Sequence, residues 1–315
     1  MMHCLIAGLH LTVETDDQEL LARMEPRYGV FTHRPSELTG VPVLFALRVT
    51  ERFEPLADAE VMSEFECEGC WCVYAESDDM VQITIQEPKE HRTVAQMQCD
   101  KAFKEARCWL SGNVWAREYC INNYLMMLFA FASMDRQTLL FHASVIARDG
   151  KAYLFLAKSG TGKSTHSSMW LKHVPGCELV NDDNPAVGIR DGRVLVYGTP
   201  WSGKTPCYRD VQYEVGGFVR VTRSAENTIG REKPVPAFAA LLPSCSGVRW
   251  DRRLQRAQGD TLAALVGMAP VYVLGCRPDK EAAVVCSMGV GAWDGKSTGE
   301  GFAKNENSIK PRLGE

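Results

Sequence analysis

The stretch Ala157–Thr165 reads AKSGTGKST, and it lies between a strand-forming run, KAYLFLA, and a run that can form a helix. Its spacing fits the phosphate-loop motif, with Ala157 in place of the first glycine. Glycines let backbone N–H groups approach phosphates closely, and the N-terminus of the following helix favours an anion. The residues predicted to bind nucleotide phosphates are Ser159, Gly160, Thr161, Gly162, Lys163, Ser164 and Thr165.

A histidine is predicted to lie at the mouth of this loop. The strand before the loop is expected to pair with the preceding run, FHASVIA, through a two-residue turn at Asp149-Gly150. That register places His142 opposite Ala157. An isolated histidine is more often structural, but this position favours a role in the site.

Two carboxylates follow the loop closely in sequence. The stretch between Lys163 and the acidic pair, Asp182 and Asp183 in CELVNDDNPAV, is long enough for only one helix and one short strand. We therefore expect the acidic pair beside the loop, at the end of the next strand. There it could bind Mg²⁺, together with Ser164, and accept a proton from a hydroxyl group. The sequence does not decide which Asp has which role, and a solvated turn is the alternative.

The stretch Gly198–Pro206, GTPWSGKTP, repeats the SGK of the phosphate loop. It lacks the spacing and the following helix of a second nucleotide site. A second Asp-Gly hairpin is expected to place Asp183 near Pro200 and Asp182 near Trp201, although prolines interrupt the ladder. We interpret the stretch as an active-site loop next to the carboxylates.

Within this loop, Lys204 is a candidate catalytic residue that could bind the transferred phosphate, and Trp201 could form a wall of the acceptor pocket. An exposed turn with a solvated lysine is the alternative. Arg220, Arg223 and Arg231 lie on or after the next strand, and one of them could stabilise transition-state charge.

The composition indicates a globular protein and excludes a bulk attraction to polyanions. The chain has 315 residues, 45% hydrophobic and 23% charged, with a formal net charge of −4. Its start lacks the pattern of a signal peptide, and its longest apolar run is shorter than the ~18 residues of a membrane span. We expect a cytoplasmic protein, with its twelve cysteines mostly reduced.

We predict three regions along the chain. Residues 1–110 alternate short apolar runs with turns and predict a β-rich accessory domain. Residues 111–288 contain the phosphate loop and predict the nucleotide-binding domain, and residues 289–315 are expected to be disordered. In the first region, Cys67, Cys70 and Cys72 could supply three zinc ligands, but no partner motif follows at suitable spacing, which favours a plain strand.

The region Leu139–Pro185 resembles the HPr kinase/phosphorylase family, which shares its nucleotide-binding core with phosphoenolpyruvate carboxykinases. It is similar to the HPr-kinase-like proteins found beside peptide-modification and peptidyl-carrier genes. The resemblance implies an α/β fold: a phosphoenolpyruvate-carboxykinase-like P-loop core with a mixed sheet, preceded here by a β-rich α+β N-terminal domain. It also implies phosphorylation of a hydroxyl, usually serine, with ATP and Mg²⁺.

The resemblance carries over residue by residue. His142 matches the upstream histidine near the catalytic carboxylate, Lys163 and Ser164 match the loop lysine and the metal-binding hydroxyl, and Asp182 and Asp183 match the base and the metal ligand. The family's downstream phosphorylase signature is missing, and the N-terminal half does not match the family's N-terminal domain. HPr as substrate, and phosphorolysis, are therefore not implied.

We predict a kinase that transfers phosphate from Mg·ATP to a hydroxyl of a peptide, a protein or a small molecule such as serine. We expect no nucleic-acid or membrane partner, and a homo-oligomer is compatible with the sequence. One alternative is a non-catalytic nucleotide-gated module for a peptide-maturation partner, although the complete set of Lys, Ser and Asp residues disfavours it. The other is a carboxykinase-type enzyme, disfavoured because no obvious arginine cluster would bind a carboxylic acid.

Overall fold

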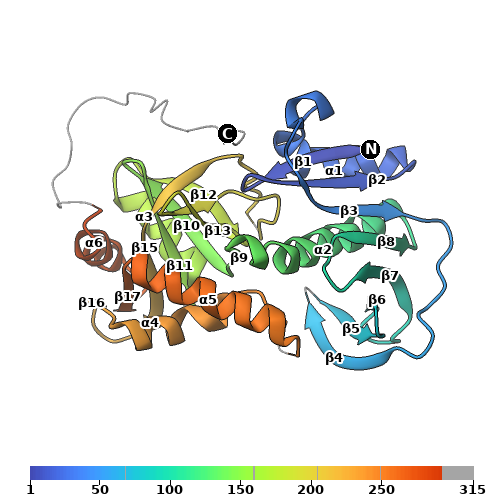
Figure 1. Ribbon diagram of the computed structural model, residues 1–315. Coiled ribbons are helices and arrows are strands. Elements are labelled where there is room, and N and C mark those ends of the chain that lie inside the picture. The colour runs from blue at the N-terminus through green and yellow to red at the C-terminus, as the bar shows by residue number, and fades with distance from the viewer. Residues whose placement is uncertain (68, 159, 204, 249, 293–315) are drawn as a thin grey trace. The chain divides into compact units, whose positions relative to one another are not determined.

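The chain folds into two compact units, which are described separately. The computed structural model describes residues 1–292 except 68, 159, 204 and 249 (Figure 1). The units divide after Ser133, later than the predicted boundary at residue 110. Most of the predicted tail, residues 293–315, lies outside the described residues. None of the helices in the described part of the chain has the length and apolar character needed to cross a bilayer.

Among its described residues, the first unit is a mixed eight-stranded sheet with two α-helices. The strand order is β1-β2-β3-β8-β7-β6-β5-β4, and the pairs β2–β3 and β3–β8 are parallel. The helices are α1 (Gln18–Tyr28) and α2 (Val114–Ala132), with short 3₁₀ turns at Gly29–Phe31 and Pro35–Leu38. The strands are β1 (Met2–Ile6), β2 (Leu9–Glu14), β3 (Val43–Val49), β4 (Glu60–Cys67), β5 (Cys70–Glu76), β6 (Met80–Gln86), β7 (Thr93–Asp100) and β8 (Glu105–Leu110).

The first apolar run of the chain, LIAGLHLTV, contains parts of two strands, the end of β1 and most of β2. Ala7 and Gly8 have positive φ values of 53° and 72°, so the chain reverses between β1 and β2. The left-handed backbone is easy for glycine and tolerated at alanine only at a cost. A two-residue turn with both residues at positive φ matches the twist of an antiparallel pair, which explains the hairpin.

The cysteine-rich stretch forms the β4–β5 hairpin, in which Cys67 pairs with Cys70 in the ladder and the Cys72 side chain is buried. Every cysteine whose side chain the structure describes is a free thiol. Among the described residues, no three or more His, Cys, Asp or Glu side chains form a metal-binding group. The strand interpretation of this stretch accounts for its spacing.

In the described part of the chain, the second unit is a mixed nine-stranded sheet with four α-helices. Its strands run in the order β12-β10-β11-β15-β14-β13-β9, with β17 beside β15 and β16 beside β17. The helices are α3 (Lys163–His173), α4 (Pro234–Leu241), α5 (Arg252–Met268) and α6 (Lys280–Gly289), with 3₁₀ turns at Met134–Arg136 and Leu242–Ser244. The strands are β9 (Thr138–Leu140), β10 (Ala143–Arg148), β11 (Lys151–Leu156), β12 (Glu178–Asp183), β13 (Ala186–Arg190), β14 (Arg193–Tyr197), β15 (Gln212–Arg223), β16 (Thr228–Arg231) and β17 (Val271–Cys276).

Both predicted Asp-Gly hairpins are confirmed in this unit. Asp149 and Gly150 have φ values of 50° and 79°, and the register between β10 and β11 pairs Ala143 with Leu156. The β13–β14 hairpin turns in the same way, with φ values of 50° and 70° at its Asp-Gly turn. The predicted registers therefore hold along both pairs.

Helix α5 has no clear local signal in the sequence. It occupies most of the stretch between α4 and β17. The Asp251 side chain caps the helix by accepting hydrogen bonds from the backbone N–H groups of Arg253 and Leu254, at 2.8 and 3.0 Å. Leu254, Leu262 and Leu265 are fully buried, so α5 forms because one side of it packs into the unit.

The parallel strands of this sheet all end at one edge. Strands β11, β15 and β17 are parallel, and β12 points the same way because β10 is antiparallel to both β11 and β12. Helices α3 and α6 pack against each other, over a core cluster that includes Phe155, Trp170 and Leu274. In open α/β sheets, ligands bind at the carboxyl ends of the parallel strands. A ligand-binding site is therefore expected at this edge of the sheet.

Candidate active site

The predicted phosphate loop connects β11 to α3 at this edge. Gly160 and Gly162 have φ values of 72° and 120°, a backbone region that side-chain-bearing residues rarely adopt. Gly162 is the N-cap of α3, and the Thr161 N–H donates to the Lys158 carbonyl at 3.0 Å. Ser159 lies outside the described residues. The two glycines thus bend the chain so that it runs into the N-terminus of a helix, where anions are stabilised.

Lys163 is the first residue of α3 and reaches back across the loop. Its Nζ donates to the Ala157 carbonyl oxygen at 3.2 Å. Partial burial lowers the pKa of Lys163, and the nearby carboxylates of Asp183 and Asp182 oppose that shift. The ammonium group therefore hydrogen-bonds the loop backbone and interacts electrostatically with both carboxylates.

The two aspartates have different partners. Oγ of Ser164 donates to Oδ1 of Asp182 at 3.0 Å. Nδ1 of His142 lies 3.0 Å from Oδ1 of Asp183. Successive side chains of a strand point to opposite faces, which accounts for the separate partners at the end of β12. The sequence left the roles of the two carboxylates open, and the structure gives the two side chains different neighbours.

The second pair is positioned by the sheet register. Asp183 pairs with Ala143 in the β10–β12 ladder, so the residue just before β10, His142, comes next to its carboxylate. The other oxygen of this carboxylate, Oδ2, accepts a hydrogen bond from Nδ2 of Asn184 at 2.9 Å. The Asp183 side chain is 18% exposed and that of His142 is 45% exposed, so both are open to a ligand.

The GTPWSGKTP stretch runs beside the carboxylates, displaced from the expected register. Asp183 bridges Ser202 and not Pro200, and the Asn184 N–H donates to the Trp201 carbonyl at 3.1 Å. The Gly203 N–H donates to the Asp182 carbonyl at 3.3 Å. The loop is thus tied by backbone hydrogen bonds to the strand that carries the acids.

The Trp201 side chain is only 2% exposed, so its ring packs in the interior and does not form the wall of an acceptor pocket that the sequence suggested. Lys204, the predicted phosphate-binding lysine, lies outside the described residues.

A buried threonine that sequence reasoning missed organises the start of the loop. Thr199 is fully buried, and its Oγ1 donates to the Asn184 carbonyl at 2.7 Å. The same oxygen accepts hydrogen bonds from Nδ2 of Asn181 at 3.1 Å and from the Trp201 N–H at 3.2 Å. Its only signal in the sequence is a polar residue between glycine and proline, which is typical of any turn.

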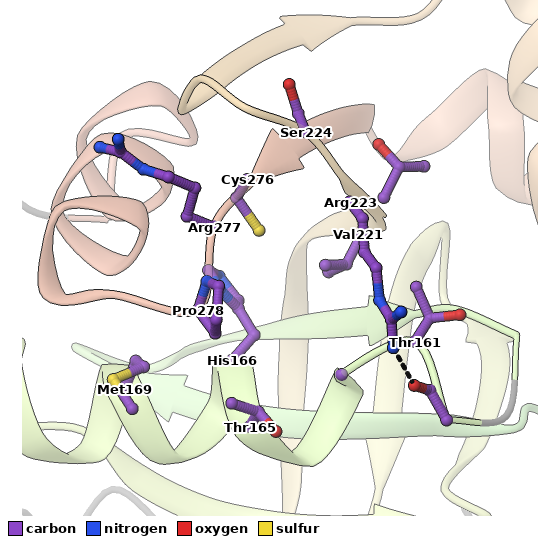
Figure 2. A pocket seen from close by; sticks show the side chains of 13 residues that line it. Thr161, Thr165, His166, Met169, Val221, Arg223, Ser224, Cys276, Arg277 and Pro278 are labelled. Atoms are coloured by element: carbon purple, nitrogen blue, oxygen red, sulfur yellow. Dashed lines mark hydrogen bonds between the residues drawn. The ribbon is translucent and has the colours of Figure 1, made fainter.

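One of the three candidate arginines contacts the phosphate loop. Nη2 of Arg223, at the end of β15, donates to the Gly160 carbonyl at 2.9 Å, drawn as the dashed line in Figure 2. Arg220 and Arg231 are exposed, and no hydrogen bond joins them to the described part of the loop. Arg223 therefore braces the loop from the side opposite the acids.

A further segment next to His142 was not anticipated. The His142 N–H donates to the Ser244 carbonyl at 2.6 Å, and Phe141 bridges Cys245. The Ser246 N–H donates to the Leu140 carbonyl at 3.0 Å. This pairing joins residues about a hundred positions apart, and no local pattern in the sequence indicates it.

No family model matches the chain, and no curated protein sequence matches it. Among solved structures, the chain is weakly similar to the Hpr(Ser) kinase/phosphatase from Coxiella burnetii. The TM-score is 0.29 and the identity 11%, over 48% of this chain and 95% of that chain. A similarity of this size assigns neither a fold nor an activity, so the functional argument rests on the geometry of the residues above.

Proposed function

We propose that this chain is a kinase that transfers the γ-phosphoryl group of Mg·ATP to a hydroxyl group, with serine of a peptide or protein, or free serine, as the expected acceptor. The observation that carries the proposal is the pair of 3.0 Å contacts beside the phosphate loop, Ser164–Asp182 and His142–Asp183. They supply a metal-binding pair and a histidine-oriented carboxylate at the same sheet edge. Phosphoryl transfer needs both functions, next to a phosphate cradle.

The residues present fit ATP and Mg²⁺. The loop has the positive-φ glycines and the helix N-terminus that a triphosphate requires, and Lys163 lies over it. Mg²⁺ usually keeps several waters and binds one or two carboxylates together with substrate phosphates. Ser164 and Asp182 would hold the ion, and bound Mg²⁺ would neutralise charge on the phosphate oxygens.

In the proposed reaction, Asp183 is the general base. Its carboxylate takes the proton of the acceptor hydroxyl as that oxygen bonds to the γ-phosphorus, while the bond to the bridging oxygen breaks and ADP leaves. His142 and Asn184 each hold one oxygen of Asp183, which fixes the direction of the remaining lone pairs. Lys163 would offset the charge on the transferred group.

The finer fold assignment belongs to the same proposal. A phosphoenolpyruvate-carboxykinase-like core is supported by the antiparallel strand β10 beside the strand that leads into the loop, and by carboxylates at the end of β12. The mixed nine-stranded sheet is compatible with that core.

The test is phosphate transfer from [γ-³²P]ATP with Mg²⁺ to serine, to serine-containing peptides and to a lysate whose labelled products are identified by mass spectrometry. We expect acceptor-dependent labelling that Lys163→Ala and Asp183→Asn abolish. Asp191→Asn, in the exposed β13–β14 turn, is the matched carboxylate control and should label normally. Normal turnover by Asp183→Asn, or no acceptor-dependent labelling from any source, would contradict the proposal.

A further inference from the structure

A cavity of about 440 Å³ opens beside the phosphate loop, away from the acidic pair (Figure 2). Its walls come from the loop, the first turns of α3, the end of β15 and the segment that joins β17 to α6. Pockets for small ligands usually measure about 300–1,000 Å³. None of the residues assigned so far to metal binding or proton transfer lines this cavity.

The strand order gives the cavity its place relative to the site. Along the sheet edge the sequence of strands is β12, β10, β11, β15, β17. The acids end β12, the phosphate loop follows β11, and the cavity lies at the ends of β15 and β17. The loop therefore lies between the carboxylates and the cavity. A triphosphate whose γ-phosphate faces Asp182 and Asp183 would direct its other end toward the cavity.

The lining suits a flat, partly apolar group. Apolar surface comes from Met169 on α3, Val221 on β15, Cys276 on β17 and Pro278 in the segment after β17, all labelled in Figure 2. Thr165 lines the side nearest the loop. The Arg277 guanidinium is paired with Asp279 at 3.0 Å and Glu281 at 2.7 Å, so its charge is already balanced by neighbouring carboxylates. Arg223 also lines the cavity, and its guanidinium donates to the Gly160 carbonyl on the side of the phosphate loop. The wall away from Arg223, formed by Met169, Cys276 and Pro278, is the part that would favour an uncharged ring.

His166 adds a hydrogen-bond donor of defined orientation. Nε1 of Trp170 donates to Nε2 of His166 at 3.1 Å, and an indole N–H can only donate. His166 is therefore a neutral imidazole with its proton on Nδ1. Burial lowers its pKa to about 4, which keeps that state at neutral pH. Among the described residues, Nδ1 of His166 has no hydrogen-bond partner, and the residue is 4% exposed and lines the cavity.

We propose that this cavity binds the nucleoside half of a nucleoside triphosphate, with His166 donating through Nδ1 to an acceptor on the base or ribose. The inference rests on the proposed function, because it uses the phosphate loop as the anchor for the triphosphate. It adds a nucleoside site built from β15, β17 and α3, and it assigns a role to a buried histidine that the phosphoryl-transfer chemistry does not use.

The test separates the nucleoside from the phosphates. Calorimetry measures the Kd of Mg·ATP and of Mg·tripolyphosphate for the wild type and for Ser224→Trp, which places a large side chain at an exposed position of the cavity wall. Glu226→Trp, an exposed residue in the same turn that does not line the cavity, is the control. A second variant, His166→Phe, removes the donor, and its tripolyphosphate affinity reports whether the loop remains folded.

We expect the wild type to bind ATP at least about tenfold more tightly than tripolyphosphate. Ser224→Trp should lose most of the extra affinity for ATP and should bind tripolyphosphate as the wild type does. The control, Glu226→Trp, should bind both ligands as the wild type does. His166→Phe should weaken ATP alone by about three- to tenfold. Equal affinities for the two ligands, or full ATP affinity in Ser224→Trp, would overturn this inference and leave the phosphate loop intact. Failure of both ligands to bind the wild type would overturn the proposed function as well.

Discussion

Nδ1 of His142 lies 3.0 Å from Oδ1 of Asp183, although His142 comes just before β10, Asp183 ends β12, and forty positions of sequence separate them. The contact follows from the β10–β12 ladder, in which Ala143 faces Asp183. The pairing of β10 with β12 therefore fixes the position of the proposed base, Asp183, and of the histidine beside it. The proton transfer that we propose depends on this sheet pairing.

The first prediction concerns this pair. Asp183→Asn should lower kcat by roughly 10²- to 10⁴-fold, the usual contribution of a general base. His142→Gln should lower kcat less and leave the KM of ATP unchanged, because His142 acts through Asp183 and does not contact the nucleotide. Steady-state kinetics of the two single variants and the double variant would show non-additive losses. Additive losses, or an effect of His142→Gln on KM alone, would contradict a positioning role.

The second prediction separates the two aspartates by metal dependence. Asp182→Asn removes a charged ligand beside Ser164, so it should raise the Mg²⁺ concentration needed for half-maximal turnover. Asp183→Asn should bind Mg·ATP normally and fail at the chemical step. The measurement is turnover as a function of Mg²⁺ at saturating ATP. The assignment of roles would be reversed if Asp183→Asn showed the raised Mg²⁺ requirement.

The third prediction tests the phosphate loop through stability. Mg·ATP at a hundred times its Kd should stabilise the folded chain by about 2.7 kcal/mol and raise its Tm by roughly 5–10 °C. Lys163→Ala should lose most of that rise but keep the Tm of the unliganded protein. Lys172→Ala, an exposed lysine in the last turn of α3, is the control. Thermal melting with and without Mg·ATP provides the comparison. If Mg·ATP raised the Tm of Lys163→Ala as much as that of the wild type, the loop would not be the phosphate-binding site.

The fourth prediction concerns the close approach of the GTPWSGKTP stretch to the acids. A methyl group on Gly203 would lie 2.9 Å from the Asp182 carbonyl oxygen and 3.2 Å from Cβ of Asp183, so the loop or the strand would have to shift. Gly203→Ala should therefore lower kcat without changing the affinity for ATP. In Gly230→Ala, by contrast, the methyl group has no heavy atom within 4 Å. Kinetics and calorimetry on both variants test this prediction. If Gly203→Ala and Gly230→Ala had the same kcat, the loop would not position the acids.

The fifth prediction is a pH dependence of stability from His166. Its pKa is lowered from 6.5 to about 4 by burial, so between these values the unfolded chain binds the proton more readily than the folded chain. The free energy of unfolding is therefore unaffected by His166 above pH 6.5. It falls by about 3 kcal/mol as the pH drops from 6.5 toward 4, because the unfolded chain takes up the proton first. His166→Phe should lose that part of the slope. Urea unfolding at several pH values measures the free energy of unfolding. The same pH dependence in His166→Phe as in the wild type would contradict a buried, neutral His166.

The parts of the site that could be predicted from the sequence are those with local signals. The Asp149-Gly150 turn fixes the β10–β11 register, and the spacing of Gly160, Gly162 and Lys163 marks the loop. The placing of both acids beside the loop followed from the short connection to β12.

The parts that could not be predicted depend on contacts distant in sequence. Prolines stop the β13–β14 ladder, so a local register could not place Ser202 opposite Asp183 or show that the Trp201 ring is buried. Helix α5 was missed because its fully buried leucines are few and Gly259 interrupts them. The pairing of Ser244 with His142 has no local signature at all.

Thr199 has a consequence for how this site could diversify. Because its hydroxyl and the neighbouring backbone bonds fasten the loop to the acid-bearing strand, the loop's main-chain position is set independently of its outward-facing side chains. Under the proposed function, exchanges among exposed side chains of the loop, such as Thr205, could alter the acceptor while the carboxylates keep their positions. Selection for a new acceptor, in nature or in a directed library, can therefore act on a few surface positions without rebuilding the chemistry beneath them.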